Sequence, residues 1–195
     1  MVYDLSKRLG EDLVLGAHLK GNLMTCSIRP AEIISEDPSS PLSRLLLEPK
    51  VQVTGSSLIP HDYIGVRDIS KAVEPALKKM TGESSDQVSG NPFFVTGFVS
   101  SNVQVAQLVA HKMGKKCIRL PFPIEETIRH SFWLKHYALT LIFKDHALGF
   151  PMHRLMEIQR FQKTFSNERA RVLIGFQPDF PVEQCIDMLI QNQTI

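Results

Sequence analysis

Hydrophobic residues recur at every fourth position near the start of the chain, and the repeat comprises Leu5, Leu9, Leu13 and Ala17. This spacing places the four side chains on one side of an α-helix, so it predicts an amphipathic helix over residues 3–20. The helix is expected to end at Gly21, because glycine after the last apolar position commonly terminates a helix. We expect its leucines to pack on one face of a core.

Four shorter apolar runs follow without a helical period. They are "NLMTCSIRP" at 22–30, "KVQVTG" at 50–55, "FFVTGF" at 93–98 and "CIRLPFP" at 117–123. Apolar runs of this length that stop at glycine or proline are typical of strands buried in a parallel sheet.

Helical patterns separate these runs. Residues 63–80 contain an extended piece and then a helix, with Asp68 as the expected N-cap and Pro75 expected to kink it. Another helix is expected over 100–116, capped by serines and ended near Gly114. Beyond the last apolar run the chain turns helical. Strands that alternate with helices indicate an α/β fold with a parallel sheet.

The charge balance narrows the class of partner. The chain of 195 residues has 22 basic and 20 acidic side chains, which leaves a net charge of +2, and the basic ones are scattered. Because a nucleic-acid-binding surface needs a concentrated basic face, we expect no nucleic-acid partner. Cys26, Cys117 and Cys185 are far apart and odd in number, which favours reduced thiols in the cytoplasm over a disulfide scaffold. The sequence predicts no metal site.

Residues 131–150 form the most apolar long stretch of the chain. They include two lysines, two histidines and an aspartate, whereas a membrane-spanning helix needs about 20 largely uncharged residues. We therefore expect no transmembrane helix here. A helix of the core or of a substrate lobe is favoured, and a helix that lies in the interface of a bilayer is the alternative.

Tyr3 and Lys7 form the candidate chemical pair of the first helix. Residues four apart lie one turn apart on the same helix face, so the ammonium can sit beside the phenol. A nearby cation favours the phenolate and lowers the pKa of tyrosine from its usual value of about 10, which makes the phenol usable as an acid–base group near neutral pH. The spacing alone is a weak signal, because so short a motif also arises by chance.

The chain lacks the glycine pattern that is typical of a nucleotide-binding sheet. A doubly wound nucleotide-binding sheet usually begins with a strand and a glycine-rich turn, where a helix N-terminus holds the pyrophosphate. The 11 glycines include no G-x-x-G-x-x-G and no P-loop spacing. If the sheet is of this kind, we expect its cofactor-binding front half to be missing from the chain.

Several segments, in order, carry a resemblance to a known family. They are Tyr3-Asp4-Leu5-Ser6-Lys7 with Glu11 one turn later, "MTCSIRPAEI", "YIGVRDISKAVEPAL", "GNPFFVTG" with the later "GKK" and "LPFP", and "FSNERARVLIGFQPDFPVEQCI". Together they resemble extended short-chain dehydrogenases/reductases, and most closely the 3β-hydroxysteroid dehydrogenase and sterol-4-alpha-carboxylate 3-dehydrogenase group. The resemblance covers essentially the whole chain and is weakest over residues 122–160.

The resemblance implies the rear half of a Rossmann-like doubly wound parallel sheet with a small, mainly helical substrate lobe. Residues 1–120 would be the rear part of the NAD(P)-binding domain, and residues 121–195 would be the lobe and the closing helices. The family's glycine-rich turn and its active-site serine or threonine belong before Tyr3, and this sequence contains neither.

The resemblance also implies the catalytic residues. Tyr3 would be the general acid/base for the substrate hydroxyl or carbonyl, next to the cofactor. Lys7 would lower the pKa of Tyr3 and would hydrogen-bond the nicotinamide ribose. Both residues would therefore also belong to the cofactor site, which would take NAD or NADP.

Two further groups of residues follow from the resemblance. The turn Arg29-Pro30-Ala31 would run against the nicotinamide, although Arg29 could equally pair with an acid at the sheet edge. Trp133 and Tyr137 would lie where the family builds its substrate lobe, although aromatic residues at this spacing more often belong to a core.

One segment departs from the family pattern. Where the family commonly has a glycine-rich stretch after the Arg-Pro turn, this chain has "RPAEIISEDP". Glu32, Ser35 and Glu36 replace small or apolar residues there. Carboxylates beside a nicotinamide site would alter the approach of the cofactor.

The implied function is an NAD(P)-dependent oxidoreductase of the 3β-hydroxysteroid dehydrogenase type, which oxidises a secondary alcohol on a steroid-like or other hydrophobic substrate. The chain is expected to be a truncated and inactive form of it. The alternative is a non-catalytic remnant that binds a hydrophobic ligand or a partner protein. A small hydrophobic alcohol or ketone, a peripheral membrane contact and a homodimer are the partners considered. The expected location is the cytoplasm or the cytoplasmic face of the endoplasmic reticulum membrane.

Overall fold

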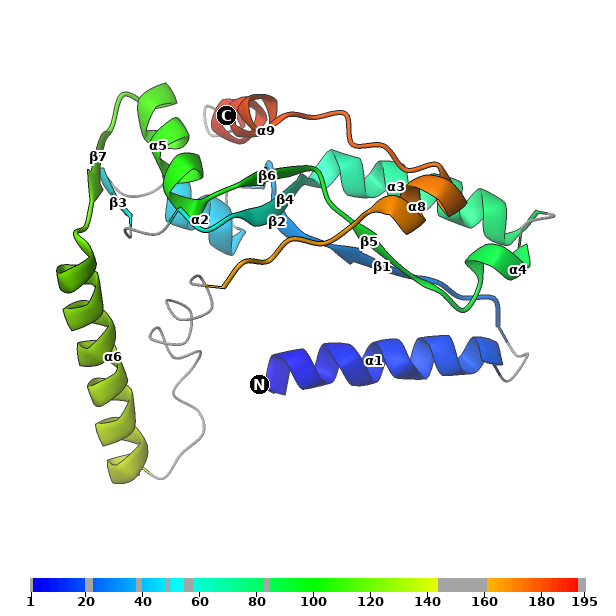
Figure 1. Cartoon of the computed structure of the whole chain (residues 1–195), viewed down its shortest axis with the longest axis horizontal. Helices are drawn as coiled ribbons and strands as arrows, with labels where there is room; N and C mark the ends of the chain where they lie inside the picture. Colours follow the sequence, from blue (N-terminus) through cyan, green and yellow to red (C-terminus); the bar gives the residue numbers. More distant parts are fainter. Residues whose placement is uncertain are drawn as a thin grey trace. The chain divides into compact units, whose positions relative to one another are not determined.

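The structure is a computed structural model that describes residues 2–19, 23–37, 40–47, 50–54, 58–82, 85–143 and 161–192. In chain order its elements are α1 (Val2–Leu19), β1 (Ser27–Pro30), β2 (Glu32–Ile34), α2 (Pro41–Leu47), β3 (Val51–Thr54), β4 (His61–Gly65), α3 (Val66–Met80), α4 (Ser85–Val88), β5 (Pro92–Val95), β6 (Phe98–Ser100), α5 (Asn102–Lys112), β7 (Lys116–Arg119), α6 (Phe122–Phe143), α8 (Glu168–Ile174) and α9 (Val182–Gln191) (Figure 1). Strands thus alternate with helices, as the sequence predicts.

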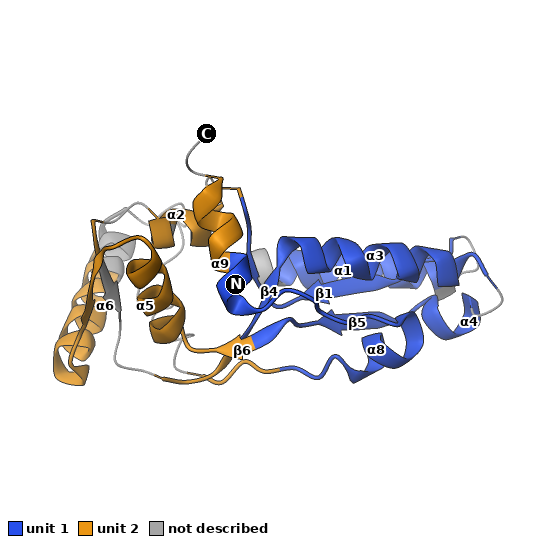
Figure 2. Cartoon of the chain, turned by 90° about the horizontal axis from the view of Figure 1, so that it is seen from above, with its two compact units in different colours: residues 1–36, 62–98, 165–185 blue, residues 37–61, 99–164, 186–195 orange. Residues whose placement is uncertain are grey.

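The chain divides into two compact units that interleave along the sequence (Figure 2). The first unit consists of Met1–Glu36, Asp62–Phe98 and Phe165–Cys185, and the second consists of Asp37–His61, Val99–Thr164 and Ile186–Ile195. The domain boundary at residue 120, which the family resemblance implies, stays a prediction.

Parallel strand pairs occur in both units. In the first unit β1 pairs with β5 from Ser27↔Pro92 to Pro30↔Val95, and β2 pairs with β4. A three-stranded sheet has the order β2-β4-β6. In the second unit β3 pairs with β7, and α5 packs on both of these strands. All three of these pairs are parallel, which confirms the predicted α/β class.

The core of the first unit lies on one face of the β1–β5 pair. Its buried members come from β4, α3, α4, β5 and the α8 region, and they are Ile64, Ala72, Ala76, Met80, Val88, Phe93, Val95, Ala170, Ile174 and Phe176. Ile28 of β1 packs against this cluster. Helices α3 and α8 cover this face, and α1 lies on the other face (Figure 1). Since side chains alternate along a strand, the neighbours of Ile28 in β1 point toward α1.

The predicted packing of α1 is wrong. Leu5, Leu9 and Leu13 are 56%, 52% and 75% exposed, although the period of four correctly predicts the helix itself. The half-buried side of α1 instead contains Glu11, Leu15 and His18. The physical reason is that β1 presents Ser27 and Arg29 to the helix, and a carboxylate satisfies these groups where a leucine would not.

The start of α3 also differs from the prediction. Its N-cap is Gly65, and Asp68 lies in the first turn rather than at the cap. Asp68 is buried, and its carboxylate accepts the backbone N–H groups of Asp179 (3.0 Å) and Phe180 (3.3 Å). Asp68 therefore joins α3 to a distant segment. The helix continues through Pro75 to Met80.

The caps of α5 agree with the sequence. The Ser101 hydroxyl accepts the N–H of Gln104 (3.2 Å), and the Gln104 side chain accepts the N–H of Ser101 (2.9 Å), which forms a capping box. The helix ends at Lys112, and Gly114 follows with a φ of +63°. The left-handed conformation after the helix favours glycine, so the predicted end at this residue is confirmed.

Candidate functional site

Helix α1 contains both predicted catalytic residues. Tyr3 and Lys7 lie four positions apart within Val2–Leu19, so the backbone places them one turn apart. The Lys7 side chain is exposed, whereas the Tyr3 side chain lies outside the described part of the structure. The expected cleft that the two side chains share therefore stays a prediction.

A polar network joins α1 to β1 one turn after Lys7. The Arg29 guanidinium donates to both carboxylate oxygens of Glu11, from Nε to Oε1 (2.8 Å) and from Nη2 to Oε2 (2.5 Å). The Ser27 hydroxyl also donates to Glu11 Oε1. The pKa of Glu11 lies below its usual value, chiefly because Arg29 donates hydrogen bonds to the carboxylate, and Ser27 acts in the same direction. Glu11 is therefore ionised at neutral pH.

Arg29 has a second neighbour on β5. Its guanidinium lies over the Phe94 ring, 5.1 Å from the centroid, and the Phe94 ring stacks on Phe165 with centroids 4.6 Å apart. Arg29 thus pairs with an acid, which is one of the two roles that the sequence leaves open. Its predicted contact with a cofactor is not tested by these distances.

The turn after β1 is positioned by the same strand pair. Ala31 is half-buried, and its N–H donates to the carbonyl of Val95 (3.0 Å), so the parallel pairing continues past Pro30. Pro30 itself is exposed. Pro30 and Ala31 of the predicted turn are therefore at the carboxyl end of β1, where ligands of open α/β sheets usually bind.

Two carboxylates follow this turn. Glu36 pairs with Arg67, whose Nη2 donates to Oε2 (2.9 Å), so this carboxylate has a cation beside it. Glu32 is exposed on β2 opposite Tyr63 of β4. Burial, and to a lesser extent the charge of Glu32, raise the pKa of Tyr63 above its usual value. Tyr63 therefore stays protonated and is a poor acid–base candidate.

The cysteines are free thiols. Burial, together with the charges of Asp68 and Glu36, raises the pKa of Cys185 to about 11. Burial also raises the pKa of Cys26. Because the thiolate is the reactive form, neither residue is a candidate nucleophile.

Helix α6 belongs to the second unit and contains the predicted lobe residues. Trp133 and Tyr137 stack on each other with centroids 5.6 Å apart, and both are about half exposed. They are therefore not core residues, and their role toward a substrate stays a prediction. No helix among the described residues is long and apolar enough to cross a membrane.

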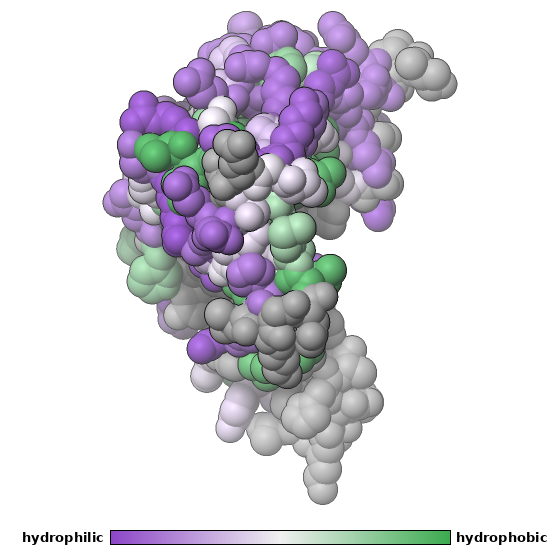
Figure 3. All heavy atoms as spheres, turned by 90° about the vertical axis from the view of Figure 1, so that its right-hand side faces the viewer, coloured by the Kyte–Doolittle hydropathy of each residue, from purple (hydrophilic) through white to green (hydrophobic). Residues whose placement is uncertain are grey.

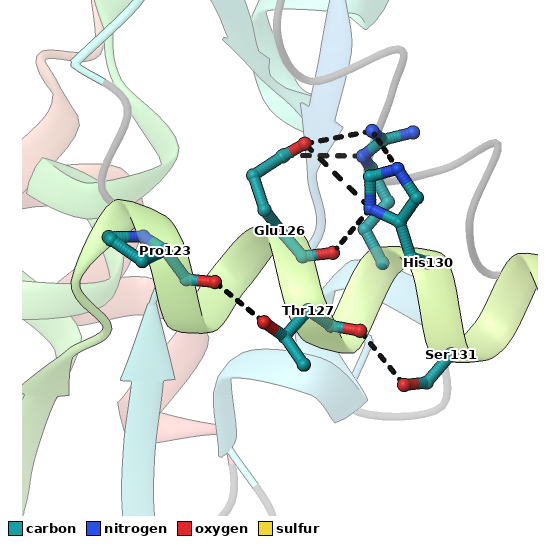
Figure 4. Close-up of polar contacts among 6 residues, drawn as sticks. Pro123, Glu126, Thr127, His130 and Ser131 are labelled. Carbon is teal, nitrogen blue, oxygen red and sulfur yellow. Dashed lines mark hydrogen bonds and ion pairs between the residues drawn. The ribbon is translucent and has the colours of Figure 1, made fainter.

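Several polar contacts of α6 before Trp133 join residues of the helix to one another (Figure 4). The Thr127 hydroxyl donates to the Pro123 carbonyl (2.9 Å), and the Ser131 hydroxyl donates to the Thr127 carbonyl (2.8 Å). Arg129 pairs with Glu126 (2.8 Å). These contacts all join residues three or four apart, so they stabilise the helix itself.

A family model identifies the family of the chain. The model of the 3-beta hydroxysteroid dehydrogenase/isomerase family matches residues 1–121, which is more than half of the chain. The chain belongs to this family. The match includes α1 with Tyr3 and Lys7 and the turn after β1. No curated protein matches the chain.

Solved structures show that this member of the 3-beta hydroxysteroid dehydrogenase/isomerase family has a Rossmann-like fold. An L-threonine dehydrogenase from Phytophthora infestans has a TM-score of 0.67 at 14% identity, over 98% of this chain and 55% of that chain. RMD from Pseudomonas aeruginosa, complexed with NADPH, has a TM-score of 0.64 at 13% identity, over 97% of this chain and 55% of that chain. A dTDP-glucose 4,6-dehydratase from Bacillus anthracis, in complex with NAD, has a TM-score of 0.63 at 14% identity, over 100% and 52%. The chain spans about half the length of these proteins.

Sequence reasoning missed the polar side of α1 in this family member. A signal for it exists in "CSIR", where Ser27 and Arg29 alternate with Cys26 and Ile28. A period of two in a strand indicates that its two faces differ. The opposite side of β1 is apolar, so the helix on the polar side needed a complementary group, and Glu11 was the acidic residue available one turn after Lys7.

Proposed function

We propose that the chain provides the acid–base part of an NAD(P)-dependent oxidoreductase of the 3β-hydroxysteroid dehydrogenase type. The substrate would be a secondary alcohol on a steroid-like or other hydrophobic molecule. The observation that carries the proposal is the family match over residues 1–121, which includes the Tyr3–Lys7 spacing on a continuous helix.

The position of α1 supports the same roles. Glu11 marks the side of α1 that lies against β1, and positions 3 and 7 precede it by two turns and one turn on the same side. In the proposed reaction the Tyr3 phenolate would accept the proton of the substrate hydroxyl, and a bound nicotinamide cofactor would supply the hydride acceptor for the carbon that bears this hydroxyl. Lys7 would lower the pKa of Tyr3 and would bind the nicotinamide ribose.

The cofactor site would need residues beyond these. The sequence contains no glycine-rich turn for the pyrophosphate, and a hydride transfer requires that the fold hold the cofactor against the substrate. We therefore propose that the 195 residues alone neither bind NAD or NADP in a saturable way nor turn over substrate. The cytoplasm, or the cytoplasmic face of the endoplasmic reticulum, is the proposed location.

The experiment joins the chain to a dinucleotide-binding segment from a relative of the family. NADH fluorescence should show saturable binding by the joined protein and none by the chain alone. In the joined protein, Tyr3→Phe should lower turnover by about 10²–10⁴-fold with little change in cofactor affinity, because only the proton-transfer hydroxyl is lost. Lys7→Ala should lower both the turnover and the cofactor affinity.

The control is Lys78→Ala on α3, which removes an exposed lysine that pairs only locally with Glu74. It should change neither turnover nor affinity. Micromolar, stoichiometric NADH binding by the chain alone would contradict the proposal that the cofactor site needs residues beyond these 195. Full turnover by Tyr3→Phe would contradict the acid–base role.

The exposed leucines of α1 favour a second candidate function. Leu5, Leu9 and Leu13 form an apolar stripe on the side of the helix away from β1, and exposed apolar surface of this kind often marks an association site. The chain would then be a non-catalytic protein that binds a partner, of which a second copy is the simplest. Sedimentation velocity measures such self-association directly.

A further inference from the structure

Polar contacts help to hold the second half of α1 on the sheet. Besides the Glu11 contacts, the Thr25 hydroxyl donates to the carbonyl of Val14 (3.1 Å). His18 packs so closely on Gly90 that an added Cβ there would lie 2.6 Å from the imidazole Cδ2. The leucine stripe is exposed. Glu11 therefore contacts β1 one turn after Lys7.

The Glu11–Arg29 pair has the geometry of a strong ion pair. Two parallel hydrogen bonds join the guanidinium and the carboxylate, and such bidentate pairs fix orientation as well as distance. The Glu11 side chain is 18% exposed and that of Arg29 is 39% exposed, so water screens this pair less than a pair on the open surface. A third donor, Ser27, holds the same carboxylate.

Arg29 is also fixed from its other side. The Phe94 ring lies under the guanidinium, and Phe165 stacks on Phe94. A guanidinium between a carboxylate and an aromatic face has few alternative orientations. Its Nε–H and one Nη2–H are already used by Glu11.

We propose that Glu11 and Arg29 form a latch that positions the Tyr3–Lys7 helix against β1, so that both are positioning residues and Arg29 is not a ligand of the cofactor. The inference rests on the proposed function for the roles of Tyr3 and Lys7. It assigns Glu11 a role that the reaction itself does not require.

The latch acts through the rotation of the helix. Successive residues of an α-helix are about 100° apart, so a one-residue change of phase would carry Glu11 away from Arg29 and would turn position 7 by the same angle. Because Glu11 follows Lys7 by four residues, the two positions share a side of α1. Holding Glu11 on Arg29 therefore holds the acid–base pair on the side of the helix that lies toward β1.

The test uses the 195-residue chain itself. Amide hydrogen exchange of residues 5–11 is measured by mass spectrometry in wild type, Glu11→Gln, Arg29→Gln and the charge-swapped pair Glu11→Arg with Arg29→Glu. The pKa of Tyr3 is followed by ¹³C NMR of the three tyrosine rings, assigned with Tyr3→Phe. Glu36→Gln is the matched control, since it removes the carboxylate of the bidentate pair with Arg67 in the same unit.

Each single variant should raise the exchange rates of α1 by about three- to fivefold, because opening the helix no longer has to break an ion pair worth up to about 1 kcal/mol. Glu36→Gln should leave them unchanged, and the charge-swapped pair should restore most of the protection. In Glu11→Gln the pKa of Tyr3 should rise toward its usual value of about 10. Loss of the negative charge by itself would lower it, so a rise reports positioning rather than direct electrostatics.

Exchange rates that stay within about twofold of wild type in both single variants would overturn the latch. A rise in exchange with an unchanged or lower pKa of Tyr3 would overturn the positioning role, because the pair would then be only a structural contact. Lys7→Ala tests the acid–base assignment separately. If this change leaves the titration of Tyr3 unchanged, the acid–base assignment is wrong. The exchange rates would still decide whether Glu11 and Arg29 form the latch.

Discussion

Asp68 is a buried carboxylate that accepts hydrogen bonds from two consecutive backbone N–H groups, those of Asp179 and Phe180. Lys71, one turn after Asp68 on α3, pairs with Asp179 and lies 4.8 Å from the Phe180 ring centroid. A single turn of helix therefore holds a segment that is more than a hundred residues later in the chain.

Removal of the charge on Asp68 should weaken this attachment. Asp68→Asn keeps the shape but replaces a charged acceptor by an amide, and hydrogen bonds to charged groups contribute about 1.5–3 kcal/mol. We expect a loss of roughly that size in the free energy of unfolding, measured by urea denaturation. Asp12→Asn is the control, because Asp12 is exposed and 3.9 Å from Arg8. A loss below about 0.5 kcal/mol for Asp68→Asn would contradict the assigned role.

The sequence located Asp68 but not its function. Aspartate near the start of a helical pattern usually accepts the N–H groups of its own helix. The sequence around Asp68 cannot show that its carboxylate accepts the N–H groups of a remote segment instead. Ser101 is the opposite case: its partner, Gln104, is three residues away, so the capping box could be predicted from the sequence alone.

At the scale of elements, α1 shows the limit of amphipathic patterns. A repeat of leucines every four residues establishes a helix with two unlike sides, but it does not tell which side meets the sheet. That choice depends on β1, whose Ser27 and Arg29 point toward α1 and bond to Glu11. The position of Tyr3 and Lys7 relative to the sheet follows from this polar contact rather than from the leucines.

The attachment of α1 should depend on pH. The folded-state pKa of Glu11 is lowered from its usual 4.5, chiefly by the hydrogen bonds from Arg29. A lowered pKa means that the contribution to stability is fully present above about pH 4.5 and is lost as the pH falls through the folded value. Because the pair is partly solvated, the contribution should be no more than about 1 kcal/mol.

The measurement compares urea unfolding of wild type and Glu11→Gln at neutral pH and at about pH 3. Wild type should be the more stable at neutral pH, and the difference should shrink in acid as Glu11 becomes protonated. Glu74→Gln on α3 serves as a control for an exposed local pair. A difference that is independent of pH would show that the ionised form of Glu11 does not matter.

At the scale of the whole chain, the order of strands and helices could be predicted because each strand is marked by an apolar run with a stop signal. The parallel pairing of β1 with β5 follows from their separation by helices. The division into two interleaved units could not be predicted in the same way, since it depends on contacts between segments such as Asp62–Phe98 and Phe165–Cys185. The described surface on the face seen in Figure 3 is mostly hydrophilic, with small apolar groups.

The leucine stripe of α1 is an exposed apolar surface that favours self-association of the chain. Each buried CH₂ group contributes about 0.8 kcal/mol, so two copies that cover each other's stripes would gain appreciable free energy. We expect the chain to self-associate, and we expect Leu9→Gln with Leu13→Gln to weaken this association at least about tenfold, or about 1.4 kcal/mol. Sedimentation velocity over a wide range of protein concentration measures the change.

The matched control for the stripe is Leu77→Gln, which removes a similarly exposed leucine from α3 of the same unit (59% exposed). It should leave the association unchanged, because Leu77 lies on α3, outside the stripe, and a few exposed apolar residues are ordinary on a protein surface. Equal weakening by both changes would indicate general surface hydrophobicity rather than a specific contact. A chain that stays monomeric at every concentration would show that the stripe is not an interface between copies. The polar contact of Glu11 with Arg29 would be unaffected by this result, because it lies on the other side of the helix.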